Sequence, residues 1–161
     1  MRSRFVLLIA VLLAGCTTVK PSARSGEATH RTLERPVVVI GGWADPGFGA
    51  THVAKYLRKH SGDDRVIAVH PGWHLSFDAA RRSVTRTIEK HFPSDDPERT
   101  VEVDVIGISM GGLIARHAAA PGHKELGPEL DAKRLFTISS PHSGARLANM
   151  FGRYAGGTGD A

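Results

Sequence analysis

Residues 101–119, VEVDVIGISMGGLIARHAA, constrain the fold of this chain more than any other stretch. Alternating β-branched residues over 101–106 predict a buried strand, and residues 113–120 predict a helix that ends at Pro121-Gly122. Between them, Gly107-Ile108-Ser109-Met110-Gly111 forms a G-x-S-x-G pattern, whose glycines permit a bend with a strained central residue. The pattern predicts that Ser109 projects its hydroxyl from this bend at the positive end of a helix, a favourable place for a nucleophile that generates an oxyanion. The alternative is a glycine-rich turn with an inert serine.

Strand and helix patterns alternate along the rest of the chain. Runs of β-branched and apolar residues predict strands at 37–40, 66–69 and 134–139. Thr51 is predicted to cap a helix over 51–60 that buries Val53, Tyr56 and Leu57. A period of four predicts an amphipathic helix over 78–92, with Ala80, Val84, Ile88 and Phe92 inside and Arg81, Arg82, Arg86 and Lys90 on its solvated face. Four repeats of this alternation predict an α/β domain with a four-stranded parallel sheet.

The first residues have the features of a bacterial export signal. A basic start, Met1-Arg-Ser-Arg4, precedes an apolar run over 5–14 that is too short to span a membrane. It ends in Leu13-Ala14-Gly15-Cys16, which contains the only cysteine of the chain and resembles the lipobox of bacterial lipoproteins. That resemblance implies cleavage after residue 15, lipidation of Cys16 and a location at the cell envelope, with the outer membrane favoured because Thr17 follows. An ordinary cleaved signal is the alternative.

The remaining composition limits domains and ligands. Residues 16–35 are predicted to be a flexible tether, residues 36–150 one domain, and residues 151–161 an irregular tail. Removal of residues 1–15 would take away Arg2 and Arg4 and lower the formal net charge from +5 to +3, which is only mildly basic and does not favour nucleic-acid binding. The histidines lack metal-ligand spacing, and there is no dinucleotide-binding or P-loop motif, so we expect neither a metal nor a cofactor.

Three segments together resemble the α/β-hydrolase superfamily, and bacterial lipases and esterases in particular. They are VVVIGGW over 37–43, VIGISMGGL over 105–113 and FTISSPHSG over 136–144. The resemblance implies a partial α/β-hydrolase fold that lacks the late strands, with Ser109 as the acyl-accepting nucleophile. It also implies that the backbone N–H groups of Trp43 and Met110 form the oxyanion hole. Gly41 and Ile108 stand where these lipases carry histidine.

The catalytic acid and base that this resemblance implies have no clear counterparts. The superfamily order is serine, then aspartate or glutamate, then histidine. Three histidines and two aspartates follow Ser109, and none lies at a predicted strand end as the catalytic residues of the superfamily do; they are His117, His123, His142, Asp131 and Asp160. Asp45 and His70 do lie at predicted strand ends, but they precede the serine. We therefore expect the chain to be the front half of a hydrolase, and to be marginally stable unless a partner or missing segment covers the sheet edge.

Three functions remain open at this point. The first is a lipid-anchored serine esterase or lipase that acts on acyl esters and is incomplete as given. The second is a non-catalytic, lipid-anchored envelope protein built on a degenerate hydrolase domain, which the absence of an identifiable base favours. The third is an acyltransferase or thioesterase on the same scaffold, which differs from the first only in the acceptor.

Overall fold

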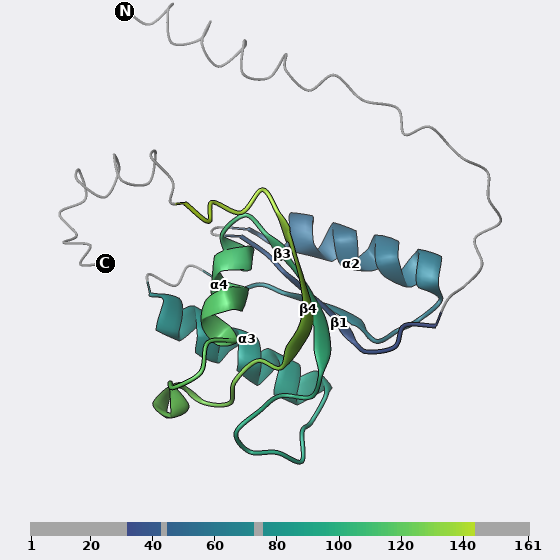
Figure 1. Ribbon diagram of the computed structural model, residues 1–161. Coiled ribbons are helices and arrows are strands. Elements are labelled where there is room, and N and C mark those ends of the chain that lie inside the picture. The colour runs from purple at the N-terminus through teal and green to yellow at the C-terminus, as the bar shows by residue number, and fades with distance from the viewer. Residues whose placement is uncertain (1–31, 43–44, 73–75, 144–161) are drawn as a thin grey trace, which may run out of the picture.

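The computed structural model describes residues 32–42, 45–72 and 76–143, which form a parallel sheet flanked by helices (Figure 1). The strands are β1 (Val37–Ile40), β2 (Val66–Val69), β3 (Val103–Ile108) and β4 (Ala132–Ile138), in the order β2-β1-β3-β4. All three strand pairs are parallel. The helices are α2 (Phe48–Ser61), α3 (Phe77–His91) and α4 (Met110–Ala118), with a 3-10 helix η1 (Lys124–Leu126) before β4. The predicted α/β class, with four parallel strands between helices, is confirmed for these ranges.

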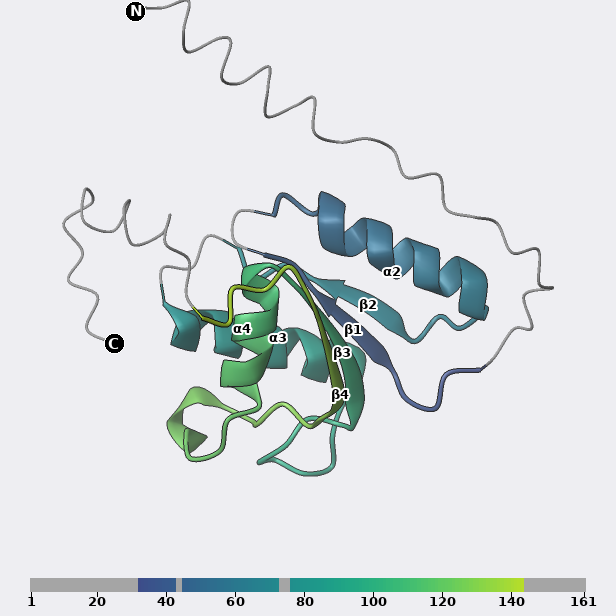
Figure 2. The same ribbon diagram turned by 45° about the horizontal axis from the view of Figure 1, so that its top comes forward.

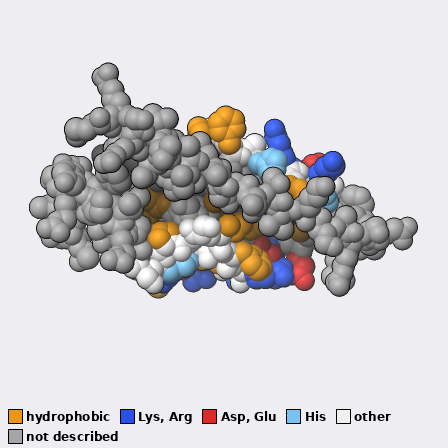
Figure 3. Space-filling model, turned by 90° about the horizontal axis from the view of Figure 1, so that it is seen from above, with side chains coloured by type: hydrophobic (Ala, Val, Ile, Leu, Met, Phe, Trp, Pro, Cys, Tyr) orange, Lys and Arg blue, Asp and Glu red, His pale blue; other side chains and the backbone are white. Residues whose placement is uncertain are grey.

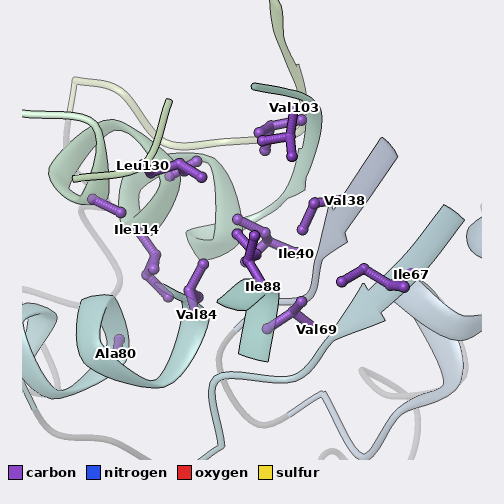
Figure 4. Close-up of a cluster of buried hydrophobic side chains, with 13 residues drawn as sticks. Val38, Ile40, Ile67, Val69, Ala80, Val84, Ile88, Val103, Ile114 and Leu130 are labelled. Atoms are coloured by element: carbon purple, nitrogen blue, oxygen red, sulfur yellow. The ribbon is translucent and has the colours of Figure 1, made fainter. Parts of the chain in front are cut away.

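The helices form two layers, one on each face of the sheet. Helix α2 covers one face, and α3 and α4 lie together on the other (Figures 1 and 2). The larger core lies under α3 and α4, where Val84 and Ile88 of α3 meet Val38, Ile40 and Val69 of the sheet (Figure 4). A smaller core under α2 contains Val37, Val39, Ala50, Ala54 and Val66. Because β1 contributes side chains to both cores, it is buried on both faces, as a central parallel strand must be.

The order of the strands creates a topological switch point between β1 and β3. The chain runs from β1 outward to β2 and then returns past β1 to β3. Right-handed crossovers in opposite directions place α2 on one face of the sheet and α3 on the other. At such a switch point the loops that leave the two strands separate, and ligands of open α/β sheets bind there, at the carboxyl ends of the strands. Gly41-Gly42 leaves β1 and Ser109 leaves β3 at this place.

The sequence predicts the first two strands at their observed bounds but misplaces the start of the first helix. Helix α2 begins at Phe48, three residues before the predicted cap Thr51. The reason is that Asp45 satisfies backbone N–H groups of the first turn, so the helix needs no cap at Thr51. Tyr56, predicted to be inside, is exposed, and the helix buries the small residues Ala50 and Ala54 instead.

One predicted surface residue, Arg81, is buried. Only 1% of Arg81 is exposed, whereas Arg82, Arg86 and Lys90 are exposed as predicted. One Nη atom of Arg81 donates hydrogen bonds to the carbonyl oxygens of His117, at 2.9 Å, and Ala120, at 3.0 Å. These carbonyls lie at the C-terminal end of α4, where the helix dipole favours a positive charge. The prediction was wrong because α3 packs against α4, a contact that the local pattern of charges does not reveal.

Candidate functional site

Ser109 forms the whole connection between a strand and a helix. Strand β3 ends at Ile108 and helix α4 begins at Met110, so a single residue reverses the backbone direction. Ser109 has φ 54° and ψ −125°, a conformation that residues with a side chain rarely adopt. Its N–H donates to the carbonyl oxygen of Ile138 at 2.8 Å, and its own carbonyl oxygen accepts from the N–H of Gly112 at 3.2 Å. These angles confirm the predicted strained bend. The residue is also exposed, so its serine is accessible to solvent.

Two of the surrounding glycines are required by close backbone contacts. A Cβ atom on Gly107 would overlap the backbone of Gly112, because the strand lies directly against the first turn of the helix. A Cβ atom on Gly111 would overlap the carbonyl oxygen of Ile40 and would lie 2.7 Å from that of Gly41. Helix α4 therefore approaches the end of β1 more closely than any side chain permits, and this contact fixes Ser109 beside β1.

The first turn of α4 differs from those of the two other described helices. The Ser76 hydroxyl caps α3 by accepting from the N–H of Ala79 at 3.2 Å. The Asp45 carboxylate accepts from N–H groups in the first turn of α2. Ser109 occupies the N-cap position of α4, yet its side chain makes no capping hydrogen bond. Serine is a preferred N-cap residue, because its hydroxyl usually accepts a hydrogen bond from a first-turn N–H group. In this bend the hydroxyl of Ser109 does not serve that purpose.

The end of β1 lies directly beside Ser109. A Cβ atom on Gly42 would lie 3.0 Å from Cβ and 3.5 Å from Oγ of Ser109. The Gly41-Gly42 segment therefore converges on the serine. Met110, the predicted oxyanion donor next to the serine, opens α4 and is partly buried. Trp43, the second predicted donor, and Cys16, the predicted lipidation site, lie outside the described residues.

The histidines that follow Ser109 contact other partners. Nε2 of His117 lies 2.8 Å from Oδ1 of Asp78, which joins α4 to α3. Nδ1 of His123 lies 3.6 Å from a carboxylate oxygen of Glu125.

His142 also has its two ring nitrogens engaged away from the serine. Nδ1 accepts from Arg116 at 3.1 Å, and Nε2 lies 3.1 Å from the hydroxyl of Thr137. Since arginine only donates, this contact fixes Nδ1 of the ring as an acceptor. Asp131 pairs with Lys133 at 3.1 Å, and Asp160 lies outside the described residues. None of these contacts joins a candidate acid or base to Ser109.

Asp45 is the polar residue near this edge whose structural role was not predicted from the sequence. Its carboxylate accepts from the N–H groups of Gly47 at 2.9 Å, Gly49 at 3.3 Å and Ala50 at 3.2 Å. Burial raises the pKa of Asp45, but these three hydrogen bonds and the nearby His70 together bring its pKa below the usual value. The sequence signal was the Asp-Pro-Gly turn ahead of the helix, since aspartate often accepts from backbone N–H groups in such turns.

His70 pairs with Asp45 rather than with the serine. Its Nδ1 lies 3.8 Å from Oδ2 of Asp45, and its Nε2 lies 3.1 Å from the hydroxyl of Thr51 on α2. Both contacts join the end of β2 to the α2 layer. The two residues that the sequence placed at strand ends therefore meet one another, and their other described partners belong to the β1–α2 turn and to the first turn of α2.

Comparisons with known proteins found no relative of this chain. No family model matches the chain, and neither the curated proteins nor the solved structures contain a match to it. Over the ranges that the structure describes, no group of three or more His, Cys, Asp or Glu side chains is arranged to hold a metal ion. Among those same residues, no helix has the length and apolar character needed to cross a membrane. The site therefore rests on its own geometry.

Proposed function

We propose that this protein is a serine hydrolase of carboxylic esters that forms an acyl-enzyme on Ser109. The observation that carries the proposal is the conformation of this residue. An exposed serine is held at φ 54° between a strand and a helix, and its side chain does not cap that helix. Backbone strain of this kind costs about 1–3 kcal/mol, and such strain clusters at functional sites. The resemblance of three segments to lipases and esterases points to the same role.

In the proposed reaction, Oγ of Ser109 attacks the carbonyl carbon of the ester while a general base takes the hydroxyl proton. The described contacts of the three histidines that follow Ser109 do not supply this base. The carbonyl oxygen becomes an oxyanion, which the backbone N–H of Met110 at the positive end of α4 stabilises. The alkoxy group then leaves with a proton, and water releases the acyl group by the same steps. A donor of this kind contributes about 3 kcal/mol to the stability of the transition state. By resemblance, the N–H of Trp43 is the second donor.

Apolar esters are the proposed substrates because apolar side chains are exposed at this edge. Phe48, at the start of α2, is 80% exposed, and Ile138, whose carbonyl accepts from Ser109, is 48% exposed. Figure 3, viewed from the top of Figure 1, shows hydrophobic side chains among the described residues on this side of the molecule. An acyl chain that lies against such side chains gains about 25 cal/mol for each Å² of apolar surface removed from water.

The location proposed for this activity is the bacterial cell envelope. The segment that ends in Cys16 supports it through its resemblance to a lipobox, with the outer membrane favoured. Two or more acyl chains hold a protein stably at a bilayer, whereas a single chain does so only marginally.

A second candidate function is a lipid-anchored envelope protein without catalytic activity. The observation that favours it is that the described contacts of His117, His123 and His142 involve partners other than Ser109. A serine hydroxyl without a base is a poor nucleophile at neutral pH. An acyltransferase or thioesterase on the same scaffold would share the acyl-enzyme and use a different acceptor.

Hydrolysis of p-nitrophenyl butyrate by the full chain separates these functions. The wild-type protein should hydrolyse the ester, and Ser109→Ala should lower kcat by at least about 100-fold. Ser83→Ala, on α3, is the matched control and should retain activity. A fluorophosphonate probe should label Ser109, as located by peptide mass spectrometry. Equal rates for wild type and Ser109→Ala, with no labelling, would reject the hydrolase and leave the non-catalytic protein.

A further inference from the structure

The side chain of Asp45 caps α2 from an unusual position. Helix α2 begins at Phe48, and its N-cap residue is Gly47, which has no side chain. The carboxylate of Asp45, two residues earlier, accepts from Gly47, Gly49 and Ala50. An anion at this place also interacts favourably with the positive end of the helix dipole. Asp45 thus ties the turn after β1 to the first turn of α2.

The same carboxylate rests against the end of β1. A Cβ atom on Gly41 would lie 2.6 Å from Oδ2 of Asp45, and one on Gly49 would lie 3.4 Å from it. Only 13% of the Asp45 side chain is exposed. Gly41 and Gly49 together leave the space that the carboxylate occupies, so Asp45 limits the movement of the strand end on the α2 side.

Helix α4 limits the same strand end from the opposite side. The first turn of α4, at Gly111, lies against the carbonyl oxygens of Ile40 and Gly41. The next residue, Gly42, borders the Cβ and Oγ atoms of Ser109. The segment from Ile40 to Gly42 is therefore held between the Asp45 carboxylate and the helix that carries the serine.

We propose that Asp45 is a positioning residue, which sets the distance between the Gly41-Gly42 strand end and Ser109 by clamping that strand end onto α4. The inference rests on the hydrolase function proposed above. Catalytic geometry tolerates little displacement, since a shift of about 1 Å can lower a rate by about 100-fold. Without the carboxylate, the turn after β1 loses three hydrogen bonds and the strand end loses its support on the α2 side.

Two substitutions at Asp45 and one control at Asp63 test this role. Asp45→Asn keeps one acceptor oxygen and allows the helix to form, whereas Asp45→Ala removes both oxygens. Asp63 is the matched control, because its carboxylate also accepts backbone N–H groups, from Leu33 and Arg65, but beside the start of β2. All variants are assayed as the full chain, at a temperature at which circular dichroism shows each to be folded.

Asp45→Ala should lower kcat for p-nitrophenyl butyrate by about 10- to 100-fold, and Asp45→Asn by a smaller factor, with KM changed less than kcat. Labelling of Ser109 by the fluorophosphonate should slow in parallel. Asp63→Asn should lower Tm and leave kcat within about twofold. A loss of Tm at Asp45 with unchanged kcat and labelling rate, as at Asp63, would overturn the positioning role while the hydrolase stands. Equal activity of wild type and Ser109→Ala would overturn both.

Discussion

Replacing Ser109 by glycine is expected to stabilise the fold while it abolishes the proposed activity. At φ 54° and ψ −125° the serine backbone is strained, by about 1–3 kcal/mol, whereas glycine adopts this region without that cost. Glycine loses about 0.5–1 kcal/mol through the greater freedom of the unfolded chain. The difference leaves Ser109→Gly more stable by up to about 2.5 kcal/mol. Ser109→Ala retains the Cβ atom and its strain, so its stability should stay close to that of the wild type.

Urea denaturation followed by circular dichroism measures this difference, with the three proteins compared at the same pH and salt concentration. Ser83→Gly is the control, because Ser83 lies inside α3, where glycine should destabilise by several tenths of a kcal/mol. The two glycine substitutions should therefore shift the midpoint in opposite directions. A Ser109→Gly protein less stable than Ser109→Ala would refute the argument that the bend stores strain.

Three further predictions concern the packing, the charges and the edge of the sheet. Gly111→Ala should destabilise the fold by at least about 2 kcal/mol in urea, because its Cβ atom would overlap the backbone of β1. Hydrogen bonding to Arg65 lowers the pKa of Asp63 from 3.8 to about 2, so its carboxylate should stabilise the fold by at most about 2 kcal/mol above pH 3.8. That contribution should disappear as the pH falls toward 2 and should be absent from Asp63→Asn in acid titrations followed by circular dichroism. Phe136→Thr should reduce self-association in sedimentation experiments, because β4 ends the described sheet with Phe136 57% exposed, and unchanged association would contradict this.

The strands could be predicted from the sequence because their signals are local, although β3 begins and ends two residues later than the predicted 101–106, and β4 begins two residues earlier than the predicted 134–139. The runs at 37–40 and 66–69 consist of residues suited to a strand buried on both faces, and their observed bounds agree with the prediction. The Ser109 bend was predictable for a related reason, since the glycines that allow it lie within four residues of one another. In a short motif of this kind, the residues that make the bend sterically possible are part of the motif itself.

Of the two features that were mispredicted, the burial of Arg81 depends on partners distant in the sequence, whereas the capping of α2 by Asp45 depends on the shape of a local turn. Arg81 looks like a surface residue until α4 places two carbonyl oxygens against it, more than thirty residues later. The capping of α2 by Asp45 depends on a turn that brings its carboxylate back over Gly41. In both cases a charged side chain is paired with a helix end, and the position of a helix end relative to other elements is set by tertiary packing.

Of these two residues, Arg81 explains how α4 can leave its first turn uncapped. Loss of a side-chain cap costs a helix about 1 kcal/mol, and α4 is short. Arg81 compensates at the other end, where it satisfies two carbonyl oxygens and places a positive charge at the negative end of the dipole. Asp45 meanwhile occupies the positive end of α2. Of the three described helices that open at this edge, α4 alone has no side-chain oxygen bonded to its first-turn N–H groups, and those groups lie beside Ser109. Removing Ser109 should therefore disturb the fold far less than removing Arg81.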